Sequence, residues 1–334
     1  MTKRITQKDV AALAGVSQAV VSVVLTKGNH TYPQETVIRV EQAANQLGYI
    51  PNRFAQALKT NKTMSIACIV PDIANPFYAS LVRGVQSVTD RYHYDAIVAS
   101  TDGLRERELH FLRWSAQGRV DAVVGTFFNV GMKDFAPYLQ AGIPIARIEA
   151  RMKKSGPLPL HNVYIDNAAA ARSAVEYLLA QGGHRNITMI ASAGGPEPAR
   201  VEGYRQAMTQ AGRLPRIKIL PGFNEQSGYQ IAMQLINDGT LPDAIFAAND
   251  LMAIGVMRAA REKGITIPEQ LAVMGFDDIP AAGLVTPSLT TIAQYPEQLG
   301  QKAAALLLAQ TDITAPLQGS TTEMPWGLVK RESA

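Results

Sequence analysis

Two short apolar patterns with helical spacing follow one another at the start of the chain. Gly15 separates them, and Ser17 is suited to cap the second helix through its hydroxyl. The expected inner faces of the two helices are Val10, Leu13 and Ala14, then Val21, Val24 and Leu25.

A third helical pattern runs from about Pro33 to Leu47, and proline suits a first helical turn. Its inner stripe is Val37, Val40, Ala44 and Leu47. Two short helices joined by a tight glycine-containing turn form a helix-turn-helix, whose second helix can enter the major groove of DNA. Such patterns also occur by chance. Here the pattern lies in a basic segment ahead of a long apolar region, which favours a ligand-responsive DNA-binding protein.

From Met64 onward, strand-like apolar runs alternate with longer helical patterns. This alternation is typical of parallel sheets covered by helices on both faces. The expected strands are 65–70, 95–100, 121–126, 144–148, 187–191, 217–220, 244–248 and 271–275. The expected helices are 76–92, 104–117, 132–141, 166–181, 199–211, 226–238 and 249–263.

Two successive sets of four strands predict an α/β core with two similar lobes, each a doubly wound parallel sheet. A return through Leu289–Ile292, a helix near 296–309 and a strand region near 320–329 would join the lobes by several crossings, as in a hinge. We therefore predict an all-α headpiece over 1–50, a hinge helix and linker over 51–63, and a core over 64–334. Lobe 1 would hold about 64–165 and 293–320, and lobe 2 about 166–292 and 321–334.

Charge is unevenly distributed along the 334 residues, whose net charge is +4. Residues 1–62 carry a net charge of +5, which leaves −1 on the remainder. The charged residues of this segment are Lys3, Arg4, Lys8, Lys27, Arg39, Arg53, Lys59 and Lys62, against Asp9, Glu35 and Glu41. A positive end on a near-neutral body suits phosphate binding by that end.

Several other classes of protein receive little support. The single cysteine, Cys68, lies in an apolar run and allows no disulfide within the chain. The basic start has no apolar segment behind it, and no apolar stretch is long enough to span a membrane, so we expect a cytoplasmic protein. There is no glycine-rich phosphate loop, no metal-binding motif and no histidine pair at ligand spacing, so we expect neither an enzyme nor a cofactor or metal.

Eight collinear motifs resemble the LacI/GalR family of bacterial transcription regulators, and the resemblance covers essentially the whole chain. They are the stretches 9–17, 47–53, 75–78, 182–185, 200–204, 248–255, 275–279 and 286–292. The resemblance implies a homodimer that binds a pseudo-palindromic operator and whose affinity responds to a small molecule. It also implies a core similar to periplasmic sugar-binding proteins of the ribose type.

The resemblance places DNA contacts on the headpiece. Thr6, Ser17 and Ser22 match phosphate-contacting positions, although Ser17 serves equally as a helix cap. Gln18 and Ala19 begin the recognition helix and are expected to face base edges, where Gln can bond adenine and Ala can touch a thymine methyl.

Val23 departs from the family pattern, since many members carry a polar residue there. Its side chain cannot hydrogen-bond a base edge and offers only apolar contact. Val20 is also more apolar than the usual Thr. The alternative is that both valines pack within the headpiece or contact nothing, so the operator sequence stays open.

The segment 52–58 resembles the hinge helix of the family, with candidate DNA-binding residues Asn52, Arg53, Ala55 and Leu58. A leucine at the position of Leu58 wedges into the minor groove in the family, and such a wedge kinks the duplex. The alternative is a leucine that packs against the core.

Candidate ligand residues follow the strands, because open α/β sheets bind ligands at the carboxyl ends of their strands. Aromatic rings after strands of both lobes could sandwich a flat sugar face, and the polar groups could bond several hydroxyls. For Asp166 the alternative is a helix cap, and for Arg200 a structural ion pair. The effector-binding candidates are Asn75, Phe77, Tyr78, Glu149, Asp166, Arg200, Phe223, Asn249, Asp277 and Gln294.

We therefore predict a DNA-binding transcription regulator, most simply a repressor, that is controlled by a sugar or sugar derivative. Its partners would be operator DNA, the effector and a second copy of the chain, with no membrane. A transport-type sugar-binding protein shares the core but has no use for residues 1–60, and a sugar-modifying enzyme is the third alternative. The sequence leaves open the effector's identity and whether it releases or promotes DNA binding.

Overall fold

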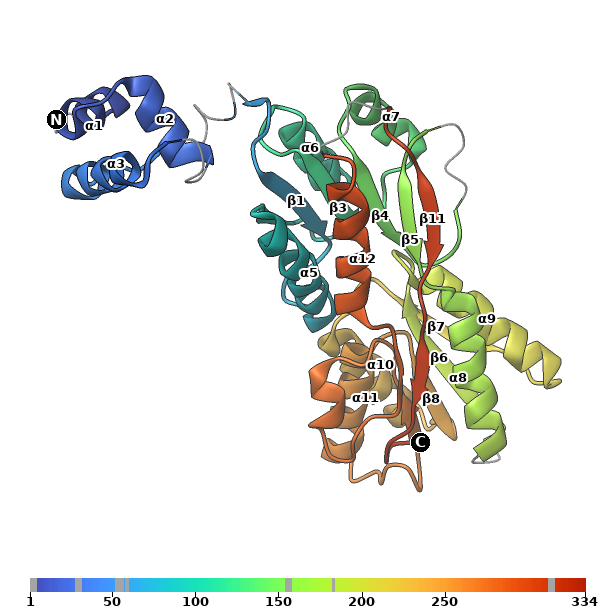
Figure 1. The fold of residues 1–334 in the computed structure, drawn as a ribbon. Helices are drawn as coiled ribbons and strands as arrows, with labels where there is room; N and C mark the ends of the chain where they lie inside the picture. Colours follow the sequence, from blue (N-terminus) through green and yellow to red (C-terminus); the bar gives the residue numbers. More distant parts are fainter. Residues whose placement is uncertain are drawn as a thin grey trace. The chain divides into compact units, whose positions relative to one another are not determined.

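The computed structural model describes residues 5–27, 32–51, 57, 60–153, 158–181, 184–311 and 316–334. The chain forms two compact units, Met1–Met64 and Ser65–Ala334, which we call the headpiece and the core. Figure 1 shows the helical headpiece and the α/β core. The predicted hinge residues Asn52, Arg53, Ala55 and Leu58 lie outside the described residues.

The headpiece contains three helices, α1 (Gln7–Ala14), α2 (Gln18–Lys27) and α3 (Gln34–Leu47). They enclose a small apolar cluster in which Val10, Val21 and Val40 are buried. The two expected faces of α2 and α3 are confirmed. On α1 the expectation for Leu13 is wrong: its side chain is 47% exposed, and Ala11 is buried instead. Successive helical residues are rotated by about 100°, so a face centred between Ala11 and Ala14 turns Leu13 outward.

The first lobe of the core is a six-stranded parallel sheet. Helices α5 (Pro76–Thr89) and α12 (Pro296–Leu308) lie side by side along one face. Helices α6 (Arg105–Ser115) and α7 (Met132–Gln140) cover the other face through Leu112, Phe135 and Leu139. The strand order is β11 (Ser320–Glu323), β5 (His161–Tyr164), β4 (Ile145–Glu149), β3 (Ala122–Thr126), β1 (Ser65–Val70) and β2 (Asp95–Ser100).

The sheet of the first lobe corrects the prediction in two ways. Strand β5 was not predicted, because its four residues include His161 and Asn162 and lack an apolar run. All four are buried, and the polar pair is satisfied in place: His161 Nδ1 lies 2.8 Å from Ser320 Oγ, and Asn162 accepts from Arg147. Strand β11 also belongs wholly to this sheet, so the division expected at 320 falls after Glu323 instead.

The second lobe is a four-stranded parallel sheet in the order β7 (Arg216–Leu220), β6 (Ile187–Ser192), β8 (Ala244–Ala247), β9 (Ala272–Met274). Successive residues of β6 point to opposite faces, Met189 toward α8 (Asn167–Gln181) and α9 (Glu197–Gln210), and Ile190 toward α10 (Glu225–Asn237) and α11 (Asp250–Glu262). This burial on both faces explains the continuous apolar runs of the sequence.

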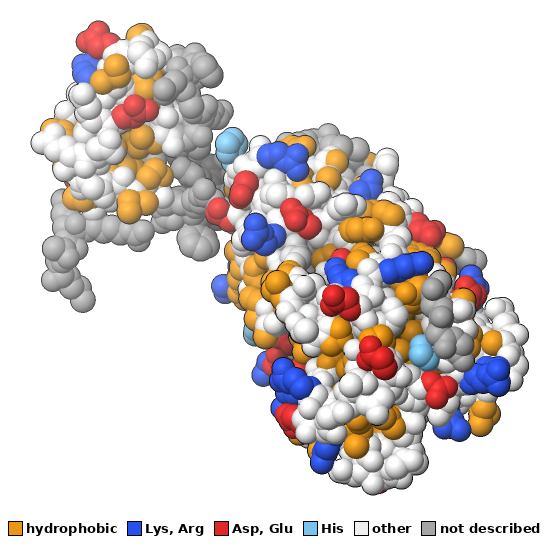
Figure 2. All heavy atoms as spheres, turned by 90° about the horizontal axis from the view of Figure 1, so that it is seen from below, with side chains coloured by type: hydrophobic (Ala, Val, Ile, Leu, Met, Phe, Trp, Pro, Cys, Tyr) orange, Lys and Arg blue, Asp and Glu red, His pale blue; other side chains and the backbone are white. Residues whose placement is uncertain are grey.

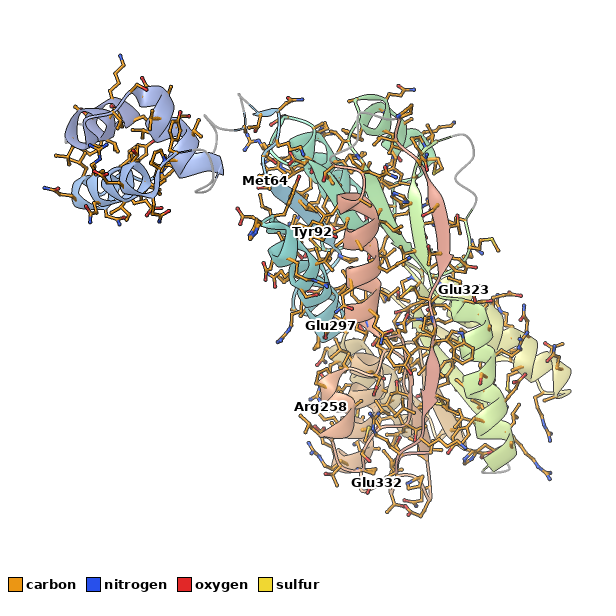
Figure 3. All side chains as sticks on the ribbon, viewed as in Figure 1. Met64, Tyr92, Arg258, Glu297, Glu323 and Glu332 are labelled. Carbon is orange, nitrogen blue, oxygen red and sulfur yellow. The ribbon has the colours of Figure 1, made fainter. Side chains whose placement is uncertain are left out.

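The chain passes between the lobes after β5, before α12 and after β11. The first passage leads into α8. The later two flank α12 and β11 and connect them to β10 (Thr291–Ala293) and β12 (Gly327–Val329), which pair antiparallel and pack against α8. Figure 3 shows Glu297 at the start of α12 and Glu323 at the end of β11, both at the level of this junction. The predicted return through 289–292 and the helix near 296–309 are confirmed.

Among the described residues, no single helix is long and apolar enough to cross a membrane. Helices α1 and α2 meet the length and composition criteria only as a pair, with a bend of 104° between them.

On the face of the core shown in Figure 2, basic and acidic side chains are interspersed.

Candidate functional site

The first two helices form the predicted helix-turn-helix. Gly15 ends α1 with φ 67°, a left-handed conformation that glycine adopts without steric cost. The Ser17 hydroxyl then accepts from the backbone N–H of Val20 at 3.3 Å, which is the predicted cap of α2. The turn is therefore determined locally by two residues that the sequence already singles out.

The exposed surface of α2 begins with Gln18 and Ala19, whereas Ser22 and Val23 are half-buried. The Gln18 amide lies within 3.4 Å of Gln7 Oε1, so its contact is with an exposed neighbour on α1. Val20 packs against the apolar cluster of the headpiece, so the alternative that this valine is a packing residue fits. Val23 is half-buried and lies on the outer side of the helix.

Thr6 precedes α1 and is tied to its first turn. Its backbone N–H and its hydroxyl both donate to Asp9 Oδ2, at 2.8 and 2.7 Å. The exposed hydroxyl also has a lone pair left for a further donor.

In the core, a cavity lies where the carboxyl ends of the strands of both lobes meet. Nine of the ten predicted effector residues line it, and Asp166 does not. The nine are Asn75, Phe77, Tyr78, Glu149, Arg200, Phe223, Asn249, Asp277 and Gln294. Asp166 instead accepts from the N–H of Ala169 at 2.9 Å in the first turn of α8, so the alternative reading as a helix cap holds.

Arg200 of α9 is the centre of the polar wall contributed by the second lobe. Its guanidinium donates from Nε to Asn167 Oδ1 at 2.7 Å and from Nη1 to the carbonyl of Ala248, while Nη2 lies 3.3 Å from Asp277 Oδ1. It also stacks over the ring of Phe276, 3.9 Å from the centroid. Because the side chain is only 4% exposed, these partners hold it in one position.

Asp277 reaches the cavity from an unusual backbone conformation, with φ 123°. Gln294 donates from Nε2 to its Oδ1 at 2.5 Å. Burial raises the pKa of Asp277 to about 8, against the opposing effect of Arg200, and the nearby Asp250 adds to the rise. The buried carboxyl therefore gains from any further donor that a ligand brings.

Glu197 and Asn249 lie beside Asp277 and hydrogen-bond to backbone groups of the protein itself. Asn249 caps α11 by accepting from Met252 N at 2.8 Å, and its amide donates to the carbonyl of Phe223 at 2.8 Å. The buried Glu197 accepts from the N–H of Ser192, and burial raises its pKa. Asn249 thus positions Phe223 as well as lining the cavity.

The first lobe contributes a second group of charges. Glu149, at the end of β4, lies 3.2 Å from Arg147 Nη1 and 2.6 Å from Lys153 Nζ. Asn75 also lines the cavity, and it caps α5 by accepting from Phe77 N at 3.0 Å. Two predicted residues therefore have structural partners as well as cavity-facing atoms.

The aromatic walls differ from the expected sandwich. The rings of Phe77 and Tyr78 pack edge to face with centroids 5.1 Å apart, and both side chains are largely buried. The ring near Phe223 is Phe128, at 6.1 Å and 77°. Sequence reasoning missed Phe128 because it weighed only one aromatic motif in the first lobe, although Phe128 follows the predicted strand 121–126 directly.

Other lining residues were also missed, among them Thr126, Lys153, Asn167, Ser192 and Glu197. Their common signal is a position at the end of a strand or within five residues after it, which applies to many residues and does not select among them. Groups of three or more His, Cys, Asp or Glu side chains arranged to hold a metal ion are absent from the described part of the chain.

Together, a helix-turn-helix headpiece and a two-lobed core with a polar cavity define a ligand-responsive DNA-binding protein. A model of bacterial regulatory proteins of the lacI family matches residues 6–52, and one of a periplasmic binding protein-like domain matches residues 141–334. The chain belongs to the lacI family of transcription regulators.

Relatives match over almost the whole chain. Catabolite control protein A of Priestia megaterium is 32% identical over 335 residues, covering 98% of this chain and 99% of that protein. A ribose operon repressor of Halalkalibacterium halodurans is 34% identical over 330 residues, covering 98% and 96%. These relatives bear out the predicted class of regulator.

Solved structures agree with the fold. The lac repressor dimer bound to operator and the anti-inducer ONPF superposes with a TM-score of 0.83 at 28% identity, covering 99% of both chains. A lacI family regulator of Enterococcus faecium with bound ribose has a TM-score of 0.71 at 28% identity, covering 80% of this chain and 98% of that one. The predicted fold class, a helical headpiece with a two-lobed parallel-sheet core, is confirmed.

Proposed function

We propose that this regulator is a repressor whose affinity for its operator is controlled by a neutral sugar or sugar derivative bound in the cavity of the core. The observation that carries the proposal is the buried network of Arg200, Asp277, Gln294 and Asn167 in that cavity. Donors and acceptors held in fixed positions suit a ligand with several hydroxyl groups.

The occupied donors of the cavity favour a neutral ligand over a phosphate. The two basic side chains among the described lining residues already have acceptors of their own, Arg200 in Asn167 and the carbonyl of Ala248, and Lys153 in Glu149. A phosphate would need an uncompensated cation or an open helix N-terminus. The start of α5 is capped by Asn75 and that of α11 by Asn249. The start of α9 also lines the cavity and has no side-chain cap among the described residues, but its first turn carries the acidic Glu197, which opposes an anion there.

On the DNA side, Gln18 and Ala19 are the proposed base-reading residues, with Thr6, Ser17 and Ser22 on phosphates and Val23 in apolar contact. The exposure of Gln18 and Ala19 at the start of α2 supports this assignment. The proposed contacts of the hinge rest on sequence resemblance and involve Asn52, Arg53, Ala55 and Leu58.

A homodimer follows from the same proposal, because two headpieces are needed to read a pseudo-palindromic operator. The solved lac repressor structure is itself a dimer on operator DNA, which supports this state. The protein would act in the cytoplasm, where bacterial DNA lies, as a non-enzymatic regulator without a cofactor.

A thermal-shift screen of the full chain against neutral pentoses, hexoses and their phosphates tests the ligand class. A neutral sugar should raise the melting temperature, since a ligand that binds only the folded state stabilises it. The same sugar should change the anisotropy-measured affinity for a selected operator. A response to sugar phosphates alone would contradict the neutral class. Sugar binding without any DNA affinity would favour the transport or sensor alternative.

A further inference from the structure

The ring of Phe128 lies between a glycine of each lobe. Phe128 follows β3 in the first lobe, and Gly195 lies between β6 and α9 in the second. A Cβ added to Gly195 would come within 2.6 Å of Phe128 Cζ, and one added to Gly103 within 3.0 Å of Cδ2. The first distance is too short for any Cβ unless the ring moves, so the ring in its present position depends on the absence of a side chain at Gly195.

Phe128 contacts the second lobe at another point as well. Its ring packs edge to face against Phe223, with centroids 6.1 Å apart. The backbone of Phe223 is in turn fixed by the amide of Asn249, at 2.8 Å. Phe128 therefore touches two separate segments of the second lobe, both of which line the cavity.

A buried carboxylate holds the Phe128 loop in place. Glu108 of α6 is fully buried, and its two oxygens accept from the backbone N–H groups of Phe128 at 2.7 Å and Asn129 at 3.0 Å. Asn129 also donates from Nδ2 to the carbonyl of Gly103 at 2.5 Å. Without the Glu108 carboxylate, the backbone N–H groups of Phe128 and Asn129 would lose this acceptor, so the position of the loop depends on Glu108.

We infer that Phe128 is the latch that holds the two lobes closed over the cavity and sets its outer wall, and that Glu108 is the positioning residue for this latch. The inference rests on the proposed function of the cavity as the ligand site. Phe128 and Phe223 are half-buried whereas Arg200 is almost fully buried, so the paired rings lie on the solvent side of the polar network. A ligand therefore has to be bound before the latch closes or leave after it opens. The latch thereby controls ligand exchange and rejects ligands that extend into the space of the ring.

Hydrogen exchange of the full-length protein without ligand tests the latch. Phe128→Ala should speed exchange of the amides in 193–198 and 222–226 by about twofold to tenfold, the range that corresponds to loss of one aromatic pair. Glu108→Gln should speed exchange in the same segments. Tyr92→Ala is the control, since Tyr92 is 57% exposed beyond the far end of α5 from the cavity and is labelled in Figure 3.

A double-mutant cycle separates a latch from general destabilisation. Gly195→Ala should also speed exchange in 222–226, because the new methyl group meets the ring of Phe128 and because alanine is strained at the left-handed φ of 60°. Only the first effect should disappear in the Phe128→Ala background, so the two changes should be less than additive. Additive effects of the two changes, or wild-type exchange in both segments of Phe128→Ala, would overturn the inference. Since no sugar is used, a failed ligand screen and a failed latch are distinguishable.

Discussion

At the scale of single residues, the core concentrates its polar chemistry on a few buried groups. Arg200 and Asp277 are each almost fully buried, and each has partners that keep it in one orientation. A site built in this way needs little rearrangement when a ligand arrives, so its hydrogen bonds contribute to affinity with a small entropic cost.

Asp277→Asn tests the contribution of this charge. The amide keeps the size of the side chain and can still accept from Gln294, but above pH 8, where Asp277 is ionised, it lacks the charge that faces Arg200. At about pH 8.5 the affinity for the sugar found by the screen should fall about tenfold to a hundredfold by calorimetry, the range of one charge-assisted hydrogen bond. Operator affinity of the ligand-free protein should stay close to that of the wild type.

The matched control is Arg205→Ala, an exposed arginine on the same helix as Arg200. It should leave sugar affinity unchanged, whereas Arg200→Ala should lower it. Equal sugar affinity in the wild type, Asp277→Asn and Arg200→Ala would remove these residues from the ligand site.

The raised pKa of Asp277 predicts a pH dependence of stability. In the folded chain this pKa is about 8, whereas exposed Asp titrates near 3.9. The folded state therefore binds a proton that the unfolded state has released, and the free energy of unfolding falls as the pH rises from about 4 to about 8. Burial raises the pKa of Asp250 to about 6, so the range from pH 6 to 8 reports more strongly on Asp277.

Urea unfolding of the ligand-free protein at pH 6, 7 and 8 measures this effect. Asp277→Asn should reduce the fall in the free energy of unfolding by up to about 1.4 kcal/mol per pH unit, the limit for one proton. Asp238→Asn, at an exposed position after α10, should keep the wild-type dependence. A variant with the same slope as the wild type would show that Asp277 is ionised throughout this range.

At the scale of elements, the exposed side chains at the start of helix α2 indicate how the base sequence of the operator is recognised. Gln18→Ala should relax preference at one base pair by about 1–3 kcal/mol if the amide bonds adenine with two hydrogen bonds. Val23→Ala should change the preference little, because valine offers no hydrogen bond. Selection of binding sites from a random pool measures both effects, with Gln42→Ala on α3 as an exposed control. A larger shift of the consensus for Val23→Ala would reverse the assignment.

The predicted hinge helix is too short to be stable alone, since isolated helices below about 12–15 residues are marginal in water. We expect it to form when two copies pack at the operator centre. Leu58→Ala should weaken specific binding and reduce DNA bending, with a smaller effect on non-specific binding, which depends on charge. Ala55→Pro should act in the same direction by breaking the helix interior.

Gel-shift measurements on specific and random DNA, with permuted sites to report bending, test the hinge. Leu214→Ala removes an exposed leucine of the core, 78% accessible, and should leave binding and bending unchanged. If Leu58→Ala and Ala55→Pro bind and bend the operator as the wild type does, a minor-groove wedge does not operate here.

At the scale of the whole molecule, the boundary at Met64 separates two compact units. Each has its own apolar cluster, around Val10 and Val40 in the headpiece and around the two sheets in the core. We expect coupling between ligand and DNA to involve the connecting segment, as a free-energy difference between two dimer arrangements, typically about 1–3 kcal/mol.

A chain of residues 65–334 should accordingly fold alone and bind the sugar with the affinity of the full chain, while losing operator binding. Calorimetry and melting temperature measure the first two properties. The affinity of the full chain for DNA should fall steeply with salt if, as proposed, basic residues of the headpiece contact phosphates. Loss of sugar binding on removal of residues 1–64 would show that the headpiece contributes to the ligand site.

The sequence by itself determined the features that depend on local pattern. Gly15 and Ser17 define the turn of the headpiece, and buried apolar runs mark the central strands. Residues shortly after strands, such as Asn249 and Asp277 in their motifs, could be assigned to the cavity because parallel strands end at a common edge.

Only the tertiary structure decided the features that depend on distant partners. Strand β5 is buried although it contains His161 and Asn162, because Ser320 and Arg147 from other strands satisfy these side chains. Glu108 lies in a helix whose sequence indicates an exposed polar face, yet it is buried beneath the loop of Phe128. The contact of Phe128 with Gly195 and Phe223 joins residues far apart in the chain, and neither periodicity nor motif spacing specifies such a pairing.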